Sequence, residues 1–266
     1  MSVPDILARP AGDPRAPIAR ANPVAKLGVS LVVSLVLLIT VDPVTAGTAL
    51  LVELAALPWC GVLPGVLIRR ARLVGFGAFS AGLVTVVFGV DSGAVLAGLG
   101  PVTVTAGSAA AGAAIALRVL AIALPGVVLL ATTDPTDLAD GLGQILRLPA
   151  TYVLSALAAM RLFGVLAEEW QTLALARRAR GLGDDGVVTV IGQGFALLVL
   201  AIRRGTVLAT AMEARGFGVR ATRTWARPSR LARGDVLLLL GGLLLGAAAT
   251  GAGVLAGTWR LVLTSS

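Results

Sequence analysis

The chain has 266 residues, of which 57% are hydrophobic and only 14% are charged, and its mean hydropathy is +0.92. An average soluble domain carries about 25% charged residues, so this composition excludes an ordinary soluble domain and is typical of a membrane protein. The chain has no histidine and a single cysteine, Cys60, which excludes an internal disulfide and disfavours zinc sites and histidine-dependent enzymes. We therefore expect no metal site and no cofactor.

The charge balance also limits the choice of partners. The net charge of +8 comes from 22 basic and 14 acidic residues, and aromatic residues make up only 4% of the chain. The basic residues flank apolar runs, as in membrane proteins whose cytoplasmic loops carry excess arginine and lysine. This pattern disfavours a nucleic-acid partner and favours the lipid bilayer of the plasma membrane.

The N-terminal residues 1–26 combine several prolines with scattered arginines, which predicts a disordered cytoplasmic tail. An apolar run follows Lys26 directly, without a small-residue cleavage site. The sequence therefore favours a signal anchor that is kept as the first span over a cleaved signal peptide.

Five apolar runs predict five membrane-spanning helices. The first ends at Asp42-Pro43, a pair that breaks helices, and the second ends before Arg69, Arg70 and Arg72. A glycine-rich loop without basic residues separates the third span from the fourth. The predicted spans are residues 27–41, 44–67, 73–90, 102–131 and 236–257. The expected division is a tail at 1–26, a four-helix region at 27–131, a charged region at 132–234, a final helix at 235–258 and a tail at 259–266.

The arginines predict the orientation of these spans. They occur in the N-terminal tail and between the second and third spans, whereas the loops after the first and third spans have none. The N-terminus and region 132–234 are therefore expected to be cytoplasmic, and five spans place the C-terminus outside.

Region 132–234 predicts three helices, at 137–148, 150–180 and 187–215. Their arginines make them too charged to span a bilayer easily, so we expect them to lie against the membrane or against one another. Two of them carry apolar stripes at helical spacing, and the second stripe is rich in small residues that permit close helix crossing. The stripes are Ala159, Leu162, Leu166, Trp170 and Leu173, then Val190, Gly194, Leu197, Ala201, Gly205, Leu208 and Met212.

The two longer helices end in the same tripeptide. Ala179-Arg180-Gly181 closes one and Ala214-Arg215-Gly216 closes the other, and each is followed by an apolar residue and a second glycine. Glycine just past a helix end is an ordinary C-cap, which accounts for the glycines alone. It does not explain why the arginine recurs. Two guanidinium groups on rigid helix ends are suited to docking on the carboxylates and carbonyls of two similar partners.

The paired Ala-Arg-Gly motifs, with Thr132-Thr133-Asp134-Pro135 before them and Ala211–Gly218 around the second, resemble the T component of energy-coupling factor transporters. This family is called EcfT, and its dedicated members include BioN and CbiQ. The resemblance implies an all-α integral membrane protein with two long coupling helices that cross in an X. It implies two cytoplasmic ABC ATPase subunits of the EcfA type, alike or different, and a small substrate-binding S component. ATP-driven motion would then drive uptake of a vitamin or a transition-metal ion.

The resemblance also assigns roles to particular residues. Arg180 and Arg215 become the ATPase-coupling residues, each within its own Ala-Arg-Gly motif. The two stripes become a sliding contact with the S component, as a hypothesis. The coupling residues are Ala179, Arg180, Gly181, Ala214, Arg215 and Gly216, and the S-component contacts are Leu162, Leu166, Gly194, Leu197, Ala201, Gly205 and Leu208.

Two ionisable residues lie inside predicted spans, Glu53 in the second and Arg118 in the fourth. Such residues are functional hypotheses by default, and we favour a structural pair between them over a substrate or proton path. In the last span, Gly242 with Gly246 and Gly253 with Gly257 form small-xxx-small pairs, which favour close packing within the bundle.

Other protein classes remain as alternatives. A conventional ABC permease would carry its own substrate path but usually presents one coupling loop to its ATPase, whereas this chain has two matched helix ends. A membrane-embedded enzyme, such as a lipid-modifying transferase, needs a cluster of His, Asp or Glu side chains at membrane depth, and only Glu53 qualifies. The third alternative is a membrane scaffold without transport.

Overall fold

The structure is a computed structural model of the whole chain, and it describes residues 13, 16–40, 42–62, 64–89, 92–99, 102–181, 186–218, 225 and 227–258. The chain forms two compact units. We call the unit made of residues 10–134 and 230–266 the bundle unit, and the unit that contains residues 135–229 the hairpin unit. The bundle unit contains the helices α2 (Pro23–Ile39), α3 (Pro43–Cys60), α4 (Pro64–Phe88), α5 (Ala106–Thr132) and α9 (Arg233–Leu255), with the strands β1 (Val95–Leu99) and β2 (Val102–Thr105). The hairpin unit contains α6 (Pro135–Gln144), α7 (Ala150–Ala179) and α8 (Val187–Ala214).

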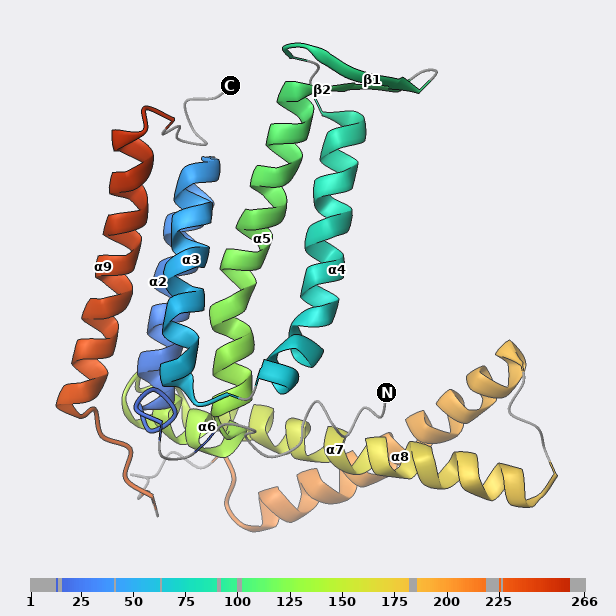
Figure 1. Ribbon diagram of the computed structural model, residues 1–266. Coiled ribbons are helices and arrows are strands. Elements are labelled where there is room, and N and C mark those ends of the chain that lie inside the picture. The colour runs from blue at the N-terminus through green and yellow to red at the C-terminus, as the bar shows by residue number, and fades with distance from the viewer. Residues whose placement is uncertain are drawn as a thin grey trace. The chain divides into compact units, whose positions relative to one another are not determined.

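The helices of the bundle unit run alternately up and down, side by side (Figure 1). Helices α2 and α3 each pack against both α5 and α9, so these four enclose a common core, and α4 packs on the outside of α5. The core is small-sided and aliphatic, and outward-facing Leu and Phe side chains stay exposed. Such a surface suits contact with lipid rather than water. The buried core residues are Val33, Leu37, Ala46, Ala49, Ala121 and Ala249.

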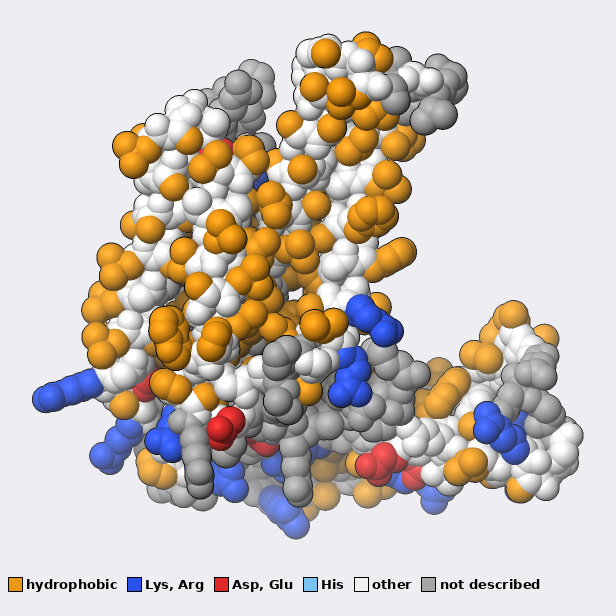
Figure 2. Space-filling view, viewed as in Figure 1, with side chains coloured by type: hydrophobic (Ala, Val, Ile, Leu, Met, Phe, Trp, Pro, Cys, Tyr) orange, Lys and Arg blue, Asp and Glu red, His pale blue; other side chains and the backbone are white. Residues whose placement is uncertain are grey.

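Basic side chains gather at one end of the bundle unit, where α4 and α9 begin, while hydrophobic side chains cover the visible faces of the helices (Figure 2). The alternating directions explain this grouping. The starts of α2, α4 and α9 share one end, so Lys26, Arg69 and Arg233 lie at that end although they are far apart in the sequence.

Six of the described helices are long and apolar enough to cross a membrane, namely α3, α4, α5, α7, α8 and α9, and α2 is a shorter apolar helix. The expected fold class, an all-α membrane protein, is confirmed. The expectation that α7 and α8 are too charged to span is wrong by this measure, because each contains an 18-residue window with at most two charged residues. Their arginines and glutamates are grouped enough to leave a long apolar window between them.

Several predicted boundaries are wrong, and α2 begins at Pro23 instead of residue 27, while α4 begins at Pro64 instead of residue 73. The second span was expected to continue to residue 67, but α3 ends at Cys60 because Gly61 adopts φ 65°, a left-handed C-cap. Arg69 and its neighbours consequently lie inside α4 and not in a loop. The fourth span was expected to begin at residue 102, but residues 102–105 pair with β1 as an antiparallel hairpin. Thr105 then starts α5 through a capping box with Ser108, in which each side-chain hydroxyl accepts a hydrogen bond from the backbone N–H of the other residue (3.0 and 3.2 Å).

Asp42 organises the turn between α2 and α3. Its carboxylate accepts hydrogen bonds from the backbone N–H of Val44 (3.0 Å) and from the backbone N–H and hydroxyl of Thr45 (3.2 and 2.7 Å). Burial alone would raise the pKa of Asp42, but these bonds, together with one from Thr258, outweigh it and lower the pKa below its ordinary value of 3.8. The residue acts as the N-cap of α3, ahead of Pro43 at the first helical position.

Glycines set the closest helix contacts of the bundle unit. A Cβ on Gly82 of α4 would lie 2.9 Å from the carbonyl oxygen of Gly112 in α5. A Cβ on Gly242 of α9 would lie 2.9 Å from Val29, and one on Gly246 would lie 3.0 Å from Val36, both in α2. The prediction that Gly242 and Gly246 pack within the bundle is therefore confirmed. Any larger side chain at these positions would separate the helices.

Within the hairpin unit, α7 and α8 form an antiparallel pair that crosses (Figure 1). Helix α6 is shorter than predicted, ending at Gln144 instead of residue 148. The side chain of Gln144 donates to the carbonyl oxygen of Arg227 (2.7 Å) and accepts from the N–H of Ser229 (2.8 Å). The ring of Trp225 covers Gly143, where a Cβ would lie 2.9 Å from ring carbon Cζ2. These contacts hold Trp225, Arg227 and Ser229 against α6.

Candidate functional site

The two Ala-Arg-Gly motifs adopt the same backbone conformation. Helix α7 ends at Ala179, with Arg180 as its C-cap at φ −89°, ψ 6°, and α8 ends at Ala214, with Arg215 as its C-cap at φ −90°, ψ 10°. The following glycines are both left-handed, Gly181 at φ 72° and Gly216 at φ 77°. The repeated tripeptide is therefore a repeated structure.

The hydrogen bonds of the two ends also correspond. The N–H of Gly181 donates to the carbonyl oxygen of Arg178 (3.0 Å), and the N–H of Gly216 donates to that of Glu213 (2.9 Å). These bonds satisfy carbonyl groups that have no partner further along the helix. Only glycine adopts the left-handed conformation without strain, which explains why it follows each arginine. The backbone thus presents each arginine at the very tip of a rigid helix.

Both arginine side chains are available to a partner. Arg180 and Arg215 are exposed, and neither guanidinium has a hydrogen-bond or ion-pair partner among the residues that the structure describes. Because α7 and α8 are antiparallel, the two tips lie at opposite ends of the crossed pair (Figure 1). The residues that follow Gly181, at 182–185, lie outside the described part of the chain.

Two polar contacts fix the crossing of α7 and α8. Arg204 forms an ion pair with Glu169, and the side-chain amide of Gln193 donates to the backbone carbonyl of Trp170 (2.8 Å). Gln193 is buried, so a missing partner there would be costly. The polar and charged groups along these helices therefore include some that hold the pair together, as well as some that face outward.

The residues expected to contact an S component lie along this crossing. Most are half-buried, and α7 packs against α8 within the hairpin unit. A Cβ on Gly194 or Gly205 would meet no atom within 4 Å, so α7 does not cover these two stripe positions, and contact with another protein through the stripes stays a prediction. The half-buried members are Leu162, Leu166, Gly194, Leu197, Ala201 and Gly205, while Leu208 is 37% exposed.

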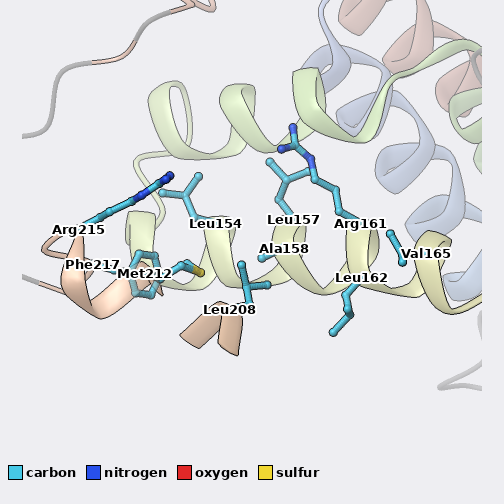
Figure 3. Close-up of a pocket in the computed structure, with 10 residues that line it drawn as sticks. All are labelled: Leu154, Leu157, Ala158, Arg161, Leu162, Val165, Leu208, Met212, Arg215 and Phe217. Atoms are coloured by element: carbon cyan, nitrogen blue, oxygen red, sulfur yellow. The ribbon is translucent and has the colours of Figure 1, made fainter. Parts of the chain in front are cut away.

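An apolar groove of about 490 Å³ lies between α7 and α8 beside the second motif (Figure 3). Leu157 and Leu162 of α7 line it, with Leu208 and Met212 of α8. Arg215 and Phe217 lie at one end of it, so the second motif adjoins an apolar surface.

Glu53 and Arg118 do not form the expected pair. The guanidinium of Arg118 donates to the carbonyl oxygen of Leu38 (2.7 Å), in the last turn of α2, where carbonyl groups lack helical partners. No described residue forms a hydrogen bond with either carboxyl oxygen of Glu53, which is 8% exposed. The prediction failed because Arg118 lies at the C-terminus of α2, where its guanidinium bonds to a carbonyl group without a helical partner and interacts favourably with the helix dipole.

Lys26 is a structural residue that sequence reasoning missed. It is only 7% exposed, and its ammonium group donates to the carbonyl oxygen of Ala19 (2.9 Å), the carbonyl oxygen of Thr132 (3.2 Å) and the hydroxyl of Thr133 (3.5 Å). It thereby joins the start of α2 to the end of α5. Thr132 and Thr133 open the segment that carries the family resemblance, so the sequence marks these two residues. It does not show which cation forms hydrogen bonds with them.

Comparison with known proteins identifies the family. The model of the family CbiQ, described as cobalt transport protein, matches residues 15–224 of the chain. A curated relative from Listeria innocua, named energy-coupling factor transporter transmembrane protein EcfT, is 32% identical over 167 residues, covering 58% of this chain and 63% of the relative. A protein of the same name from Limosilactobacillus fermentum is 29% identical over 159 residues, covering 53% of this chain and 60% of the relative. The match thus spans somewhat less than two thirds of each relative. Since the family model covers most of this chain, the chain belongs to the EcfT/CbiQ family of transporter transmembrane components.

Proposed function

We propose that this chain is the membrane-embedded coupling subunit of an energy-coupling factor importer, and that it transmits the ATP-driven motion of two cytoplasmic ATPases to a substrate-binding S component. The observation that carries the proposal is the pair of matched helix ends. Each presents an exposed arginine in the same C-cap geometry, as two docking points for two similar motor subunits require.

The two helices have the dimensions of levers. Helix α7 has 30 residues and α8 has 28, which corresponds to lengths of about 45 and 42 Å at 1.5 Å per residue. The Arg204–Glu169 ion pair and the Gln193 contact tie them together near the crossing. A displacement applied at Arg180 or Arg215 would therefore move the joined pair rather than bend one helix alone.

The S component is proposed to use the small-residue stripe of α8 and the apolar surface of both helices. A Cβ placed on Gly194 or Gly205 would meet no atom within 4 Å, so α7 leaves room beside these glycines. Phe195, Leu198 and Ile202 stay exposed on a neighbouring face of α8. Close approach at small residues, with apolar side chains around them, is how helices associate within membranes.

The cargo is proposed to be a transition-metal ion or a vitamin, chosen by the S component. The family description, cobalt transport protein, supports the metal ion. The basic end of the bundle unit is proposed to face the cytoplasm, since loops rich in arginine and lysine are retained on that side.

Co-purification tests the proposal. The full-length chain is expressed with its ATPases and S component and isolated in mild detergent as wild type, R180E, R215E and the double variant. Truncating a charged hot-spot residue typically costs 2 kcal/mol or more, about 30-fold in affinity, and charge reversal should cost at least that. We expect each single variant to lose most of the bound ATPase and the double variant to lose all of it, with membrane insertion unchanged.

The matched control is R203E, which reverses an exposed arginine on the same helix outside the motifs. It should retain both ATPases. Normal ATPase recovery with the double variant, or equal loss with R203E, would contradict the docking role of the motifs.

A further inference from the structure

The bundle unit contains a cavity of about 520 Å³. It is lined by α2, α3, α5 and α9, the four helices that also enclose the packed core. Most of its lining is aliphatic, including Val29, Leu57, Val128, Leu238 and Leu245. Its volume lies within the range of about 300–1,000 Å³ typical of small-molecule sites, and the space between bundle helices is a usual place for such sites.

Glu53 supplies a polar anchor in this apolar space. It lines the cavity, is 8% exposed, and has both carboxyl oxygens without a hydrogen-bond partner among the described residues. Buried polar groups are ordinarily satisfied, and an unpaired carboxylate in an apolar environment is costly. Glu53 therefore has the burial and the vacant acceptors of a group that awaits a ligand.

The nearby cations do not satisfy Glu53. Lys26 lines the same cavity, but its ammonium group donates to Ala19, Thr132 and Thr133. Arg118 donates to the carbonyl oxygen of Leu38. Neither cation therefore supplies a hydrogen bond to Glu53.

We propose that this cavity binds a single-chain membrane amphiphile with a primary ammonium headgroup, its hydrocarbon chain among the aliphatic residues and its ammonium on Glu53. A primary ammonium has three donors and a positive charge, so it satisfies both carboxyl oxygens and neutralises them in charge-assisted hydrogen bonds. A hydroxyl headgroup offers one donor and no charge. The exposed apolar faces of the surrounding helices would place such a molecule within reach in the bilayer.

Photolabelling tests this site. Full-length protein in mild detergent is labelled with a hexadecylamine that carries a diazirine in its chain, and unlabelled hexadecylamine, hexadecanol and butylamine compete. We expect labelled peptides from α2, α3, α5 and α9, full competition by hexadecylamine, at least tenfold weaker competition by hexadecanol and none by butylamine. Competition by butylamine would assign the site to a soluble amine and overturn the membrane source.

Three variants connect the label to the cavity. E53Q is isosteric and uncharged, and it should weaken labelling at least tenfold while the gel-filtration profile stays that of wild type. A56L adds volume beside Glu53, at a cavity-lining position one helical turn further along α3, and should weaken labelling as well. E168Q neutralises an exposed carboxylate of α7 and is the matched control, with labelling unchanged.

The proposal is independent of ATPase docking, because the cavity lies wholly within the bundle unit. Wild-type labelling in E53Q, equal competition by the alcohol and the amine, or labelled peptides outside the four helices would each overturn it.

Discussion

The left-handed backbone alone should make the glycines that follow Arg180 and Arg215 intolerant of substitution. Gly181 has φ +72°, yet a Cβ there would meet no atom within 4 Å, so alanine would cause no clash. Alanine at this position would still destabilise the helix end, because the left-handed conformation costs about 1–2 kcal/mol for a residue with a side chain. Gly164, in the interior of α7, also has open space but an ordinary helical conformation. Alanine should stabilise that position by about 0.5–1 kcal/mol.

This difference predicts opposite effects of one substitution on one helix. A cost of 1–2 kcal/mol corresponds to about a 5- to 30-fold larger population of the opened last turn, since 1.4 kcal/mol is tenfold. Hydrogen exchange of the full-length protein in detergent reads this directly, in peptides that contain the amides of Arg180 and Gly181, which donate to Arg177 and Arg178. G181A should accelerate their exchange, whereas G164A should leave it unchanged or slower.

A graded variant sharpens the test. Asparagine tolerates the left-handed conformation better than alanine, so G181N should fall between wild type and G181A. Equal exchange in G181A and wild type, or equal acceleration by G164A, would refute the assignment of the cost to φ. Loss of ATPase recovery in G181A with the arginine intact would then show that the motif works through the position of Arg180 as well as its charge.

Three further predictions concern the bundle unit and are checked by thermal unfolding in detergent. G82A should destabilise the protein by about 1–3 kcal/mol, because its Cβ would press on the α5 backbone. G77A on the same helix would meet no atom within 4 Å and should be neutral or stabilising. Equal unfolding temperatures of the two variants would contradict this. K26M should lower the free energy of unfolding by about 1–3 kcal/mol, because it leaves hydrogen-bond acceptors at the end of α5 unpaired. The control is R69M, which changes an exposed residue and should stay within about 0.5 kcal/mol of wild type. Because the pKa of Asp42 is lowered in the folded state, the ionised carboxylate stabilises the fold above pH 3.8, and this stabilisation is lost as the pH falls through the folded-state pKa. D42N should therefore lose less stability than wild type between pH 5 and 3. Parallel curves of stability against pH would refute this.

Several errors of sequence reasoning have one physical origin. The pair Glu53–Arg118 was expected because both residues lie at membrane depth, yet Arg118 binds the end of α2. Lys26 was expected to end a disordered tail, yet it is buried at the start of α2 and binds the end of α5. A helical pattern states which residues share a face, but the choice of partner depends on how segments far apart in the chain are arranged. Helix ends compete for cations because their last carbonyls are unpaired.

Local boundaries failed for a different reason. The break after Cys60 depends on the left-handed Gly61, and the hairpin at 95–105 depends on pairing between two short segments. Hydropathy averages over such features, since an apolar strand and an apolar helix look alike over a few residues.

The sequence by itself determined the membrane class, the family and the two motif-bearing helix ends, because apolar run length and capping residues act over a single helix. Only the tertiary structure decided that Arg118 and Lys26 bind the ends of α2 and α5, and that no described residue forms a hydrogen bond with the carboxyl group of Glu53. These outcomes depend on distances between groups that the chain brings together from afar, and no local pattern contains those distances.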